Sequence, residues 1–322
     1  MLISAKLSRF GLAAGILALG LGPAAAQDYP ERAIDFIVPF NPGGGADSSQ
    51  RTFNKYAEPI VGQPLVIVNK PGAGGTAGWA EMVRAEPDGY TLAIVTPPFN
   101  VIPALARPQQ TGYTLDQFTY LCVYAVVPDV LLVREDSEYE TLADLIEYAK
   151  ANPGQIKAAN TGTLGADFMT TLLIENATGM EFTQIPFTGG AEALQGTLAG
   201  TTDAMVASSL FAVAQEGTLR TLAIAAPERD PNIPDVPTFT ELGFDVVSER
   251  YRVLGGPPGL PQEIVDYWAD VCQQVTSNED FRSEMNDLGQ PPAYRGPAEA
   301  RASIDAMQEN MQALVDAYDL AE

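Results

Sequence analysis

The sequence predicts an α/β protein with mainly parallel sheets. Short runs rich in β-branched and aromatic residues alternate with helical segments along most of the chain. A glycine-containing turn follows four of the predicted strands, near residues 43, 73, 162 and 189. Strands that alternate with helices are typical of βαβ units, whose strands lie parallel, and a length of 322 residues favours two domains over one.

The first third of the chain carries three of these units. Strands are expected at 33–40, 63–69 and 91–96, and helices over 47–60 and 76–86. Asp47 stands where the first helix is expected to begin, so its carboxylate is predicted to cap the free N–H groups of the first turn.

The remaining elements continue the alternation. The apolar stretch 118–133 is expected to be broken by Pro128, and Thr141 is expected to cap an amphipathic helix over 141–154. Further elements are expected as follows: strand–turn–helix units from 155 and from 182, short strands at 201–209 and 219–226, and helices from 261 onward.

The N-terminus has the layout of a secretory signal peptide. Lys6 and Arg9 precede a short apolar core, and Ala24 and Ala26 fit the small-residue cleavage pattern. Residues 1–26 are therefore predicted to be removed by cleavage before Gln27. A membrane anchor is the alternative, but the apolar core is too short to span about 30 Å comfortably.

The charge of the chain excludes several kinds of partner. Cleavage would reduce the 18 Lys and Arg residues to 16 against 41 Asp and Glu residues, a net charge of −25. Nucleic acids and anionic membrane surfaces both need clustered basic residues and are not expected as partners. The charge can serve solubility alone, but an anionic ligand would require local positive potential at its site.

The sequence contains no histidine and two cysteines, Cys122 and Cys272. The missing histidine excludes Ser-His-Asp triads, Cys-His dyads and His-ligated zinc, and no cofactor or metal is expected. An oxidising compartment would permit a disulfide, but the sequence cannot place the two Cα atoms close together. The pairing is left open.

The four glycine-containing turns indicate where a ligand would bind. In an open α/β sheet such turns lie at the carboxyl edge, and helix N-termini there present N–H groups to anions. A carboxylate fits better than a phosphate, because "NPGGGADS" lacks the Lys-Ser/Thr ending of a P-loop. The alternative for each turn is that glycine serves only the turn geometry.

Longer motifs resemble a known family. "YPERAIDFIVPFNPGGGADSSQR", "GQPLVIVNKPGAGGTAGW", "AEPDGYTLAI", "IPFTGGAEALQGTLAGTTDAM" and "LGGPPGLPQEIVDYW" follow in order along nearly the whole mature chain. They resemble the Bug/tripartite tricarboxylate transporter (TctC-like) periplasmic substrate-binding proteins. The resemblance implies a two-lobed periplasmic binding protein type II fold, each lobe a mainly parallel sheet flanked by helices.

The resemblance also implies domain boundaries and a function. Lobe 1 is expected to comprise 27–120 plus 254–322, and lobe 2 to comprise 121–253, with crossings near 119–124 and 252–257. The protein is expected to be a periplasmic monomer without enzymatic activity. It would capture a small di- or tricarboxylate and deliver it to a tripartite tricarboxylate-type membrane permease. Two alternatives remain: a sensing protein that docks a membrane receptor, and a secreted carboxylate-processing enzyme.

The residues that match the family's binding loops form the candidate site. From lobe 1 they are Phe40, Gly43, Gly44, Gly45, Asp47, Ala73 and Gly74. From lobe 2 they are Thr161, Gly162, Thr163, Thr188, Gly189, Asp203 and Ser208. Arg252 matches the arginine of the family's "WRG" triplet, written "YRV" here, and Asp167 stands near the place where many members carry a histidine. For Arg252 and Arg250 the alternative is a surface residue paired with an acid.

Overall fold

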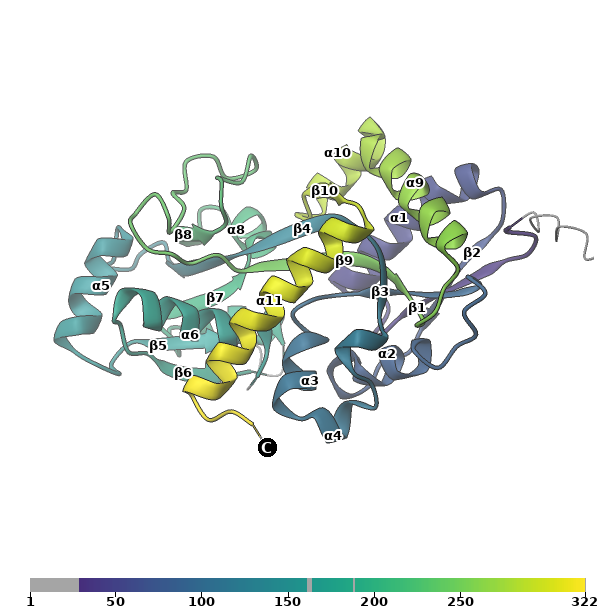
Figure 1. Ribbon diagram of the computed structural model, residues 1–322. Coiled ribbons are helices and arrows are strands. Elements are labelled where there is room, and N and C mark those ends of the chain that lie inside the picture. The colour runs from purple at the N-terminus through teal and green to yellow at the C-terminus, as the bar shows by residue number, and fades with distance from the viewer. Residues whose placement is uncertain (1–28, 161–163, 188, 322) are drawn as a thin grey trace, which may run out of the picture.

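The protein folds into two lobes that lie side by side and share two long strands (Figure 1). The computed structural model describes residues 29–160, 164–187 and 189–321. The predicted signal peptide and the candidate residues at 161–163 and 188 lie outside this described part of the chain.

The first lobe is built on three parallel strands in the order β2-β1-β3. They are β1 (Ile34–Val38), β2 (Leu65–Asn69) and β3 (Thr91–Val95). The connecting helices are α1 (Gly45–Val61), η1 (Ala73–Gly75), α2 (Thr76–Met82), α3 (Val101–Ala106), α4 (Pro108–Thr111) and η2 (Leu115–Gln117). The predicted alternation of strand and helix is confirmed here.

The second lobe repeats this plan with the parallel order β7-β5-β6. Its strands are β5 (Lys157–Asn160), β6 (Thr183–Pro186), β7 (Ala204–Ser208) and β8 (Leu219–Ala225). Its helices are α5 (Leu142–Ala151), α6 (Ala166–Thr178), α7 (Gly190–Leu198) and α8 (Ser209–Ala214). Thr141 caps α5 as predicted and forms a capping box with Asp144.

Two antiparallel strands, β4 (Thr119–Arg134) and β9 (Glu249–Gly256), connect the lobes. β4 pairs with β9 as far as Pro128 and with β7 and β8 from Asp129 onward. The expected break at Pro128 is wrong, because the strand continues through it. Pro128 stands opposite Glu249, the first residue of β9, where a ladder ends and a missing amide hydrogen costs least.

The sequence did not predict β9 or the short strand β10 (Pro292–Arg295), which pairs with β4. The sheets are therefore mixed, with a parallel trio in each lobe joined to antiparallel crossing strands. The predicted lobe boundaries stay a prediction. The change of partner along β4 falls at 128–129, a few residues beyond the expected crossing at 119–124.

The C-terminal helices are α9 (Gln262–Ser277), α10 (Glu279–Asp287) and α11 (Pro297–Ala317). α9 and α10 pack against α1. α11, yellow in Figure 1, packs against β4, α3 and α6 and so contacts both lobes. Among the described residues, no helix combines the length and apolar character needed to cross a membrane.

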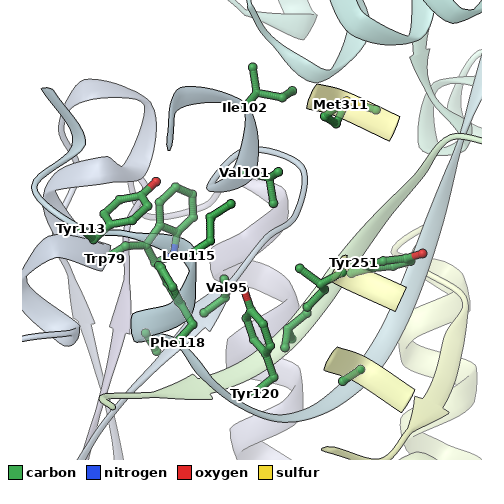
Figure 2. Close-up of a cluster of buried hydrophobic side chains, with 14 of the residues drawn as sticks. Trp79, Val95, Val101, Ile102, Tyr113, Leu115, Phe118, Tyr120, Tyr251 and Met311 are labelled. Atoms are coloured by element: carbon green, nitrogen blue, oxygen red, sulfur yellow. The ribbon is translucent and has the colours of Figure 1, made fainter. Parts of the chain in front are cut away.

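Aromatic and aliphatic side chains from distant segments fill the core beside β3 (Figure 2). The indole of Trp79 is buried there and donates a hydrogen bond of 3.0 Å to the carbonyl of Ile94. Tyr251 from β9 and Met311 from α11 join the same cluster. The crossing strand and the last helix are thus fixed to the first lobe by burial of apolar surface.

Cys122 and Cys272, whose pairing the sequence left open, form a disulfide. Both side chains are fully buried, and their Cα atoms lie 6.5 Å apart. The bond joins the start of β4 to α9, and its two cysteines are separated by 150 residues in the sequence.

Candidate ligand-binding site

A cavity of about 1190 Å³ lies between the lobes. Its walls come from loops that follow β1 and β2, the segments before α6 and α7, the end of β7 with α8, and two arginines of β9. Three of the four predicted glycine-containing turns line it, and Leu164 and Gly165 beside the fourth do so as well. The turns converge at the carboxyl ends of the parallel strands, as expected.

The loop 40–45 follows β1 and leads into α1. The amide of Gly43, a residue with φ of +81°, donates to the carboxylate of Asp47 at 2.8 Å. Asn69 and Arg51 donate to the same carboxylate at 2.9 and 2.8 Å. Burial alone would raise the pKa of Asp47, but these hydrogen bonds outweigh it and hold the pKa below its ordinary value.

Asp47 therefore fixes the loop from behind, and it is not part of the cavity wall. The prediction that Asp47 is the N-cap of α1 is wrong. The helix begins two residues earlier at Gly45, with Gly44 as its N-cap, so Asp47 lies in the first turn and accepts from an amide outside the helix.

A second loop wall comes from η1, where Gly74 has φ of +68°. Phe40 lies beside it and packs edge-on against Trp79 and Phe99, with ring centroids 5.8 and 6.3 Å apart. Gly44, by contrast, has φ of −78° and needs no glycine for its backbone conformation. At the cavity, the missing side chain of Gly44 allows a ligand to approach the backbone closely.

Arg252 of β9 lines the cavity next to Gly45. Its Nε donates to Oε1 of Gln290 at 2.7 Å, and Nε2 of Gln290 donates to the carbonyl of Gly45 at 3.0 Å. Within the described part of the chain, no acidic side chain forms an ion pair with it. Burial lowers the pKa of Arg252 to about 10, so the guanidinium is still protonated at neutral pH.

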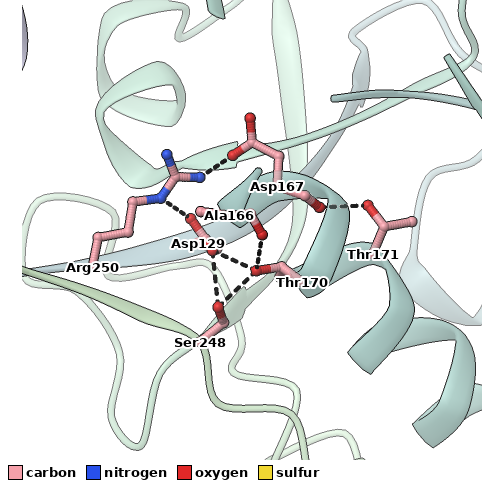
Figure 3. Close-up of polar contacts among 7 residues, drawn as sticks. All are labelled: Asp129, Ala166, Asp167, Thr170, Thr171, Ser248 and Arg250. Atoms are coloured by element: carbon pink, nitrogen blue, oxygen red, sulfur yellow. Dashed lines mark hydrogen bonds and ion pairs between the residues drawn. The ribbon is translucent and has the colours of Figure 1, made fainter. Parts of the chain in front are cut away.

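Arg250 lies two residues earlier and is compensated by two acids (Figure 3). Its Nε donates to Asp129 at 2.6 Å, and its Nη2 donates to Asp167. Burial would lower the pKa of Arg250, but the two carboxylates raise it above its ordinary value. Arg250 is therefore paired with acids, as the alternative had it, but it is a buried residue of the cavity wall and not a surface residue.

The polar cluster around Arg250 is closed by hydroxyl groups. Thr170 and Ser248 contact the second oxygen of Asp129 at 2.6 and 2.9 Å and lie 2.7 Å from each other. Asp129 is fully buried and does not reach the cavity, whereas Asp167, at the start of α6, is part of its wall. Burial raises the pKa of Asp129, and Arg250 opposes this.

The structure gathers most of the predicted residues at this cavity. Lining it are Phe40, Gly43, Gly44, Gly45, Ala73, Gly74, Gly189, Ser208 and Arg252. Asp203 lies elsewhere: it accepts from the amide of Lys157 at the opposite end of β7, about 16 Å along the strand from Ser208. We therefore remove Asp203 from the candidate site.

Several wall residues were not predicted from the sequence. They are Thr76, Phe99, Pro103, Arg107, Gln110, Thr111, Ala191, Leu210 and Phe211, together with Arg250 and Asp167 in their observed roles. Phe99 and Arg107 sit in the Pro- and Gln-rich stretch that carried no periodic signal. The described residues contain no group of three or more His, Cys, Asp or Glu side chains that could hold a metal ion.

Two lobes joined by two crossing strands, with a large cavity between them, define a type II solute-binding protein. The family described as "Tripartite tricarboxylate transporter family receptor" (TctC) matches residues 50–320, and the chain belongs to this family. The expected family and fold are thereby confirmed.

Individual relatives agree with this assignment. The chain is 30% identical to protein BugT of Bordetella pertussis over 88% of both chains. A TctC solute-binding protein from Polaromonas, solved without ligand, superimposes with a TM-score of 0.79 at 28% identity, over 89% of this chain and 99% of that one.

Two similar structures contain ligands. MatC from Rhodopseudomonas palustris, solved with bound malate, has a TM-score of 0.75 at 28% identity over 89% of this chain and all of that one. Another R. palustris protein, solved with adipate, has a TM-score of 0.78 at 25% identity over 90% of this chain and 98% of that one.

Proposed function

We propose that the protein captures a small carboxylate in the cavity between its lobes and delivers it to a membrane permease of the tripartite tricarboxylate type. The observation that carries the proposal is Arg252, a cavity-lining guanidinium whose hydrogen bond goes to a neutral amide. A planar guanidinium can donate two parallel hydrogen bonds to a carboxylate. The ligand would supply the negative charge that no described side chain provides.

The glycine loops complete the grip on the anion. Gly44 caps α1 and Gly45 begins it, both line the cavity, and Gly45 lies next to Arg252, so the N-terminus of that helix is at the same part of the cavity. Amides at a helix N-terminus favour an anion through hydrogen bonds and about half a positive charge. The loop can therefore hold a carboxylate within a strongly acidic protein.

The comparisons support this assignment. Two similar proteins hold malate and adipate, which are both dicarboxylates. The resemblance implies a di- or tricarboxylate as the ligand. Delivery to a permease is proposed from the family, whose description is that of a transporter receptor.

The site of action is proposed to be the periplasm, reached by means of the signal peptide. Edman or mass-spectrometric sequencing of the exported protein should give Gln27 as the first residue. Recovery of Met1 from the membrane fraction would contradict this proposal.

The binding proposal is tested by identifying what the protein carries. Protein purified from the periplasm is denatured, and the released small molecules are identified by mass spectrometry. We expect a carboxylate that rebinds, measured by calorimetry, and is recovered unchanged after incubation. Conversion of the ligand would favour the secreted-enzyme alternative, and capture of a receptor instead of a permease by the loaded protein would favour the sensing alternative.

A further inference from the structure

Two arginines of β9 line the same cavity, and of these two only Arg252 has no carboxylate partner among the described residues and is available to an anionic ligand. Arg250 and Arg252 are separated by one residue, so their side chains leave the strand on the same side, and both are part of the cavity wall. The guanidinium of Arg252 donates a hydrogen bond to the side-chain amide of Gln290, whereas that of Arg250 donates to two carboxyl groups.

The positive charge of Arg250 is neutralised by ion pairs within the protein. Asp129 and Asp167 together provide two carboxyl groups for one guanidinium, and both are buried, at 0% and 1% exposure. Asp129 stands behind the arginine, and Asp167 stands on the cavity side, in the first turn of α6. Among the described residues of β9, Arg250 therefore offers no uncompensated positive charge to a second ligand carboxylate.

We propose that Asp167 sets the selectivity of the cavity: it disfavours a second carboxylate on the α6 side, and the ligand presents a hydrogen-bond donor there, a hydroxyl or an ammonium. The inference rests on the proposed carboxylate-binding function and narrows it to carboxylates with one anionic end. The ligand proposed here is a hydroxy- or amino-carboxylate, in place of the di- or tricarboxylate that the resemblance implies.

The physical reason is the nature of the groups that face each other. An ionised carboxylate only accepts hydrogen bonds, so two carboxylates cannot satisfy each other, whereas a hydroxyl or ammonium donates to Asp167 directly. Like charges at close range repel more strongly within a protein than in bulk water, and opposite charges attract in the same proportion. The distal group thus changes affinity in opposite directions when its charge changes sign.

An alternative binding mode would direct the second carboxylate of a ligand toward Arg107 and away from Asp167. Arg107 lines the wall contributed by the first lobe, after α3. A dicarboxylate that extended its second end toward Arg107 would avoid Asp167 altogether. Such a ligand would bind at least as well as its monocarboxylate counterpart, and the experiment below detects this.

The test uses ligands that share one chain and differ only at the distal end. Hexanoate, adipate and 6-aminohexanoate, and the four-carbon set butyrate, succinate and 4-aminobutyrate, are titrated by calorimetry into the mature protein. We expect the amino acid to bind tightest and the dicarboxylate weakest, with the extremes differing by roughly ten- to a hundredfold. A dicarboxylate that binds tightest in both sets would overturn the proposal.

The variant Asp167→Asn keeps an oxygen for Arg250 and removes the charge. It should bring the dicarboxylate and the amino acid to within a few-fold of each other. Asp203→Asn, the same change at the far end of β7, should leave the wild-type ranking unchanged. Circular dichroism and thermal unfolding establish that each variant is folded, and the wild-type ranking tests the proposal even if a variant is not.

The two proposals fail in different ways. If no carboxylate of either set binds and none co-purifies, the carboxylate-binding function itself is wrong. If carboxylates bind and Asp167→Asn leaves the ranking of the three distal groups as it is in the wild type, only the role of Asp167 is wrong.

Discussion

Arg252 and Gln290 are joined by a hydrogen bond of 2.7 Å, and Gln290 extends the contact to the carbonyl of Gly45 at 3.0 Å. A side chain just after α10 thereby connects the arginine of the crossing strand with the first residue of α1. The guanidinium and the helix N-terminus are held in one orientation toward the cavity, which lowers the entropy lost when a ligand binds.

The substitution Arg252→Ala should weaken carboxylate binding by roughly thirtyfold to several thousandfold. Truncating one partner of a buried charged hydrogen bond costs roughly 2–5 kcal/mol, and each 1.4 kcal/mol is about tenfold. Calorimetry with the co-purified ligand measures the effect. Arg32→Ala removes the same charge at an exposed pair with Asp88 and should change little. Unchanged affinity in Arg252→Ala would place the arginine outside the site.

The substitution Gln290→Glu should weaken binding by roughly tenfold or more, because it places a carboxylate against Arg252 and supplies internally the charge that the ligand would bring. Gln290→Ala should cost less, since it removes orientation but leaves the positive charge. Comparing the two dissociation constants separates the two effects. Equal losses in both variants would mean that orientation alone matters.

The substitution Gly74→Val should weaken binding by about tenfold or more and also lower the free energy of unfolding. A β-branched residue at a φ of +68° is strained, and its side chain enters the open space beside the cavity loop. Gly154→Val is the matched control, with φ of +69° after α5 and away from the cavity wall. It should lose stability without losing affinity, and equal affinities for both variants would show that the loop is only structural.

Asp47→Asn should destabilise the protein at neutral pH by an amount that disappears in acid. The folded-state pKa of Asp47 is depressed, so its contribution to stability is present above the unfolded pKa of about 3.9 and is lost as the pH falls through the folded value. Denaturant titrations of both proteins between pH 7 and pH 3 measure the difference. A difference that stays constant over this range would contradict the assigned role.

Removing the disulfide by Cys122→Ala with Cys272→Ala should lower the free energy of unfolding by roughly 2–4 kcal/mol, because the bond closes a long loop. Denaturant unfolding with and without a reducing agent gives the measurement, and the double variant should not respond to the reducing agent. Two thiols that titrate in the unfolded, unreduced wild-type protein would show that the bridge does not form.

Local pattern was sufficient for the parallel units of both lobes. The strand β1 and the helix α5 with its Thr141 cap carry their signals within a few residues, so the sequence predicts them directly. The path of β4 through Pro128 could not be predicted in this way. Whether a proline is tolerated in a strand depends on the partner opposite, and here the partner is 121 residues away.

The candidate site likewise contains residues that a local sequence pattern predicts and residues whose roles depend on contacts with distant segments. Glycine turns next to strands could be found from sequence, and Arg252 was found through its motif. Ser208 ends the short strand β7 and Asp203 immediately precedes its first residue, and only the fold shows which end of the strand lies at the cavity. The roles of Arg250 and Asp167 depend on Asp129, which approaches from a different strand, so no local pattern contains them.

The position of β9 between β3 and β4 also constrains the order in which the protein can be completed. The first strand of the first lobe ends at Val38, but its sheet lacks a member until Glu249–Gly256 has been synthesised. The strands of the second lobe, β4 from Asp129 onward together with β5 to β8, all lie within 129–225 and need no later residue to pair with one another. Domains generally fold as units as their chain becomes available. The second lobe can therefore fold first, whereas the sheet of the first lobe stays incomplete until β9 has been synthesised.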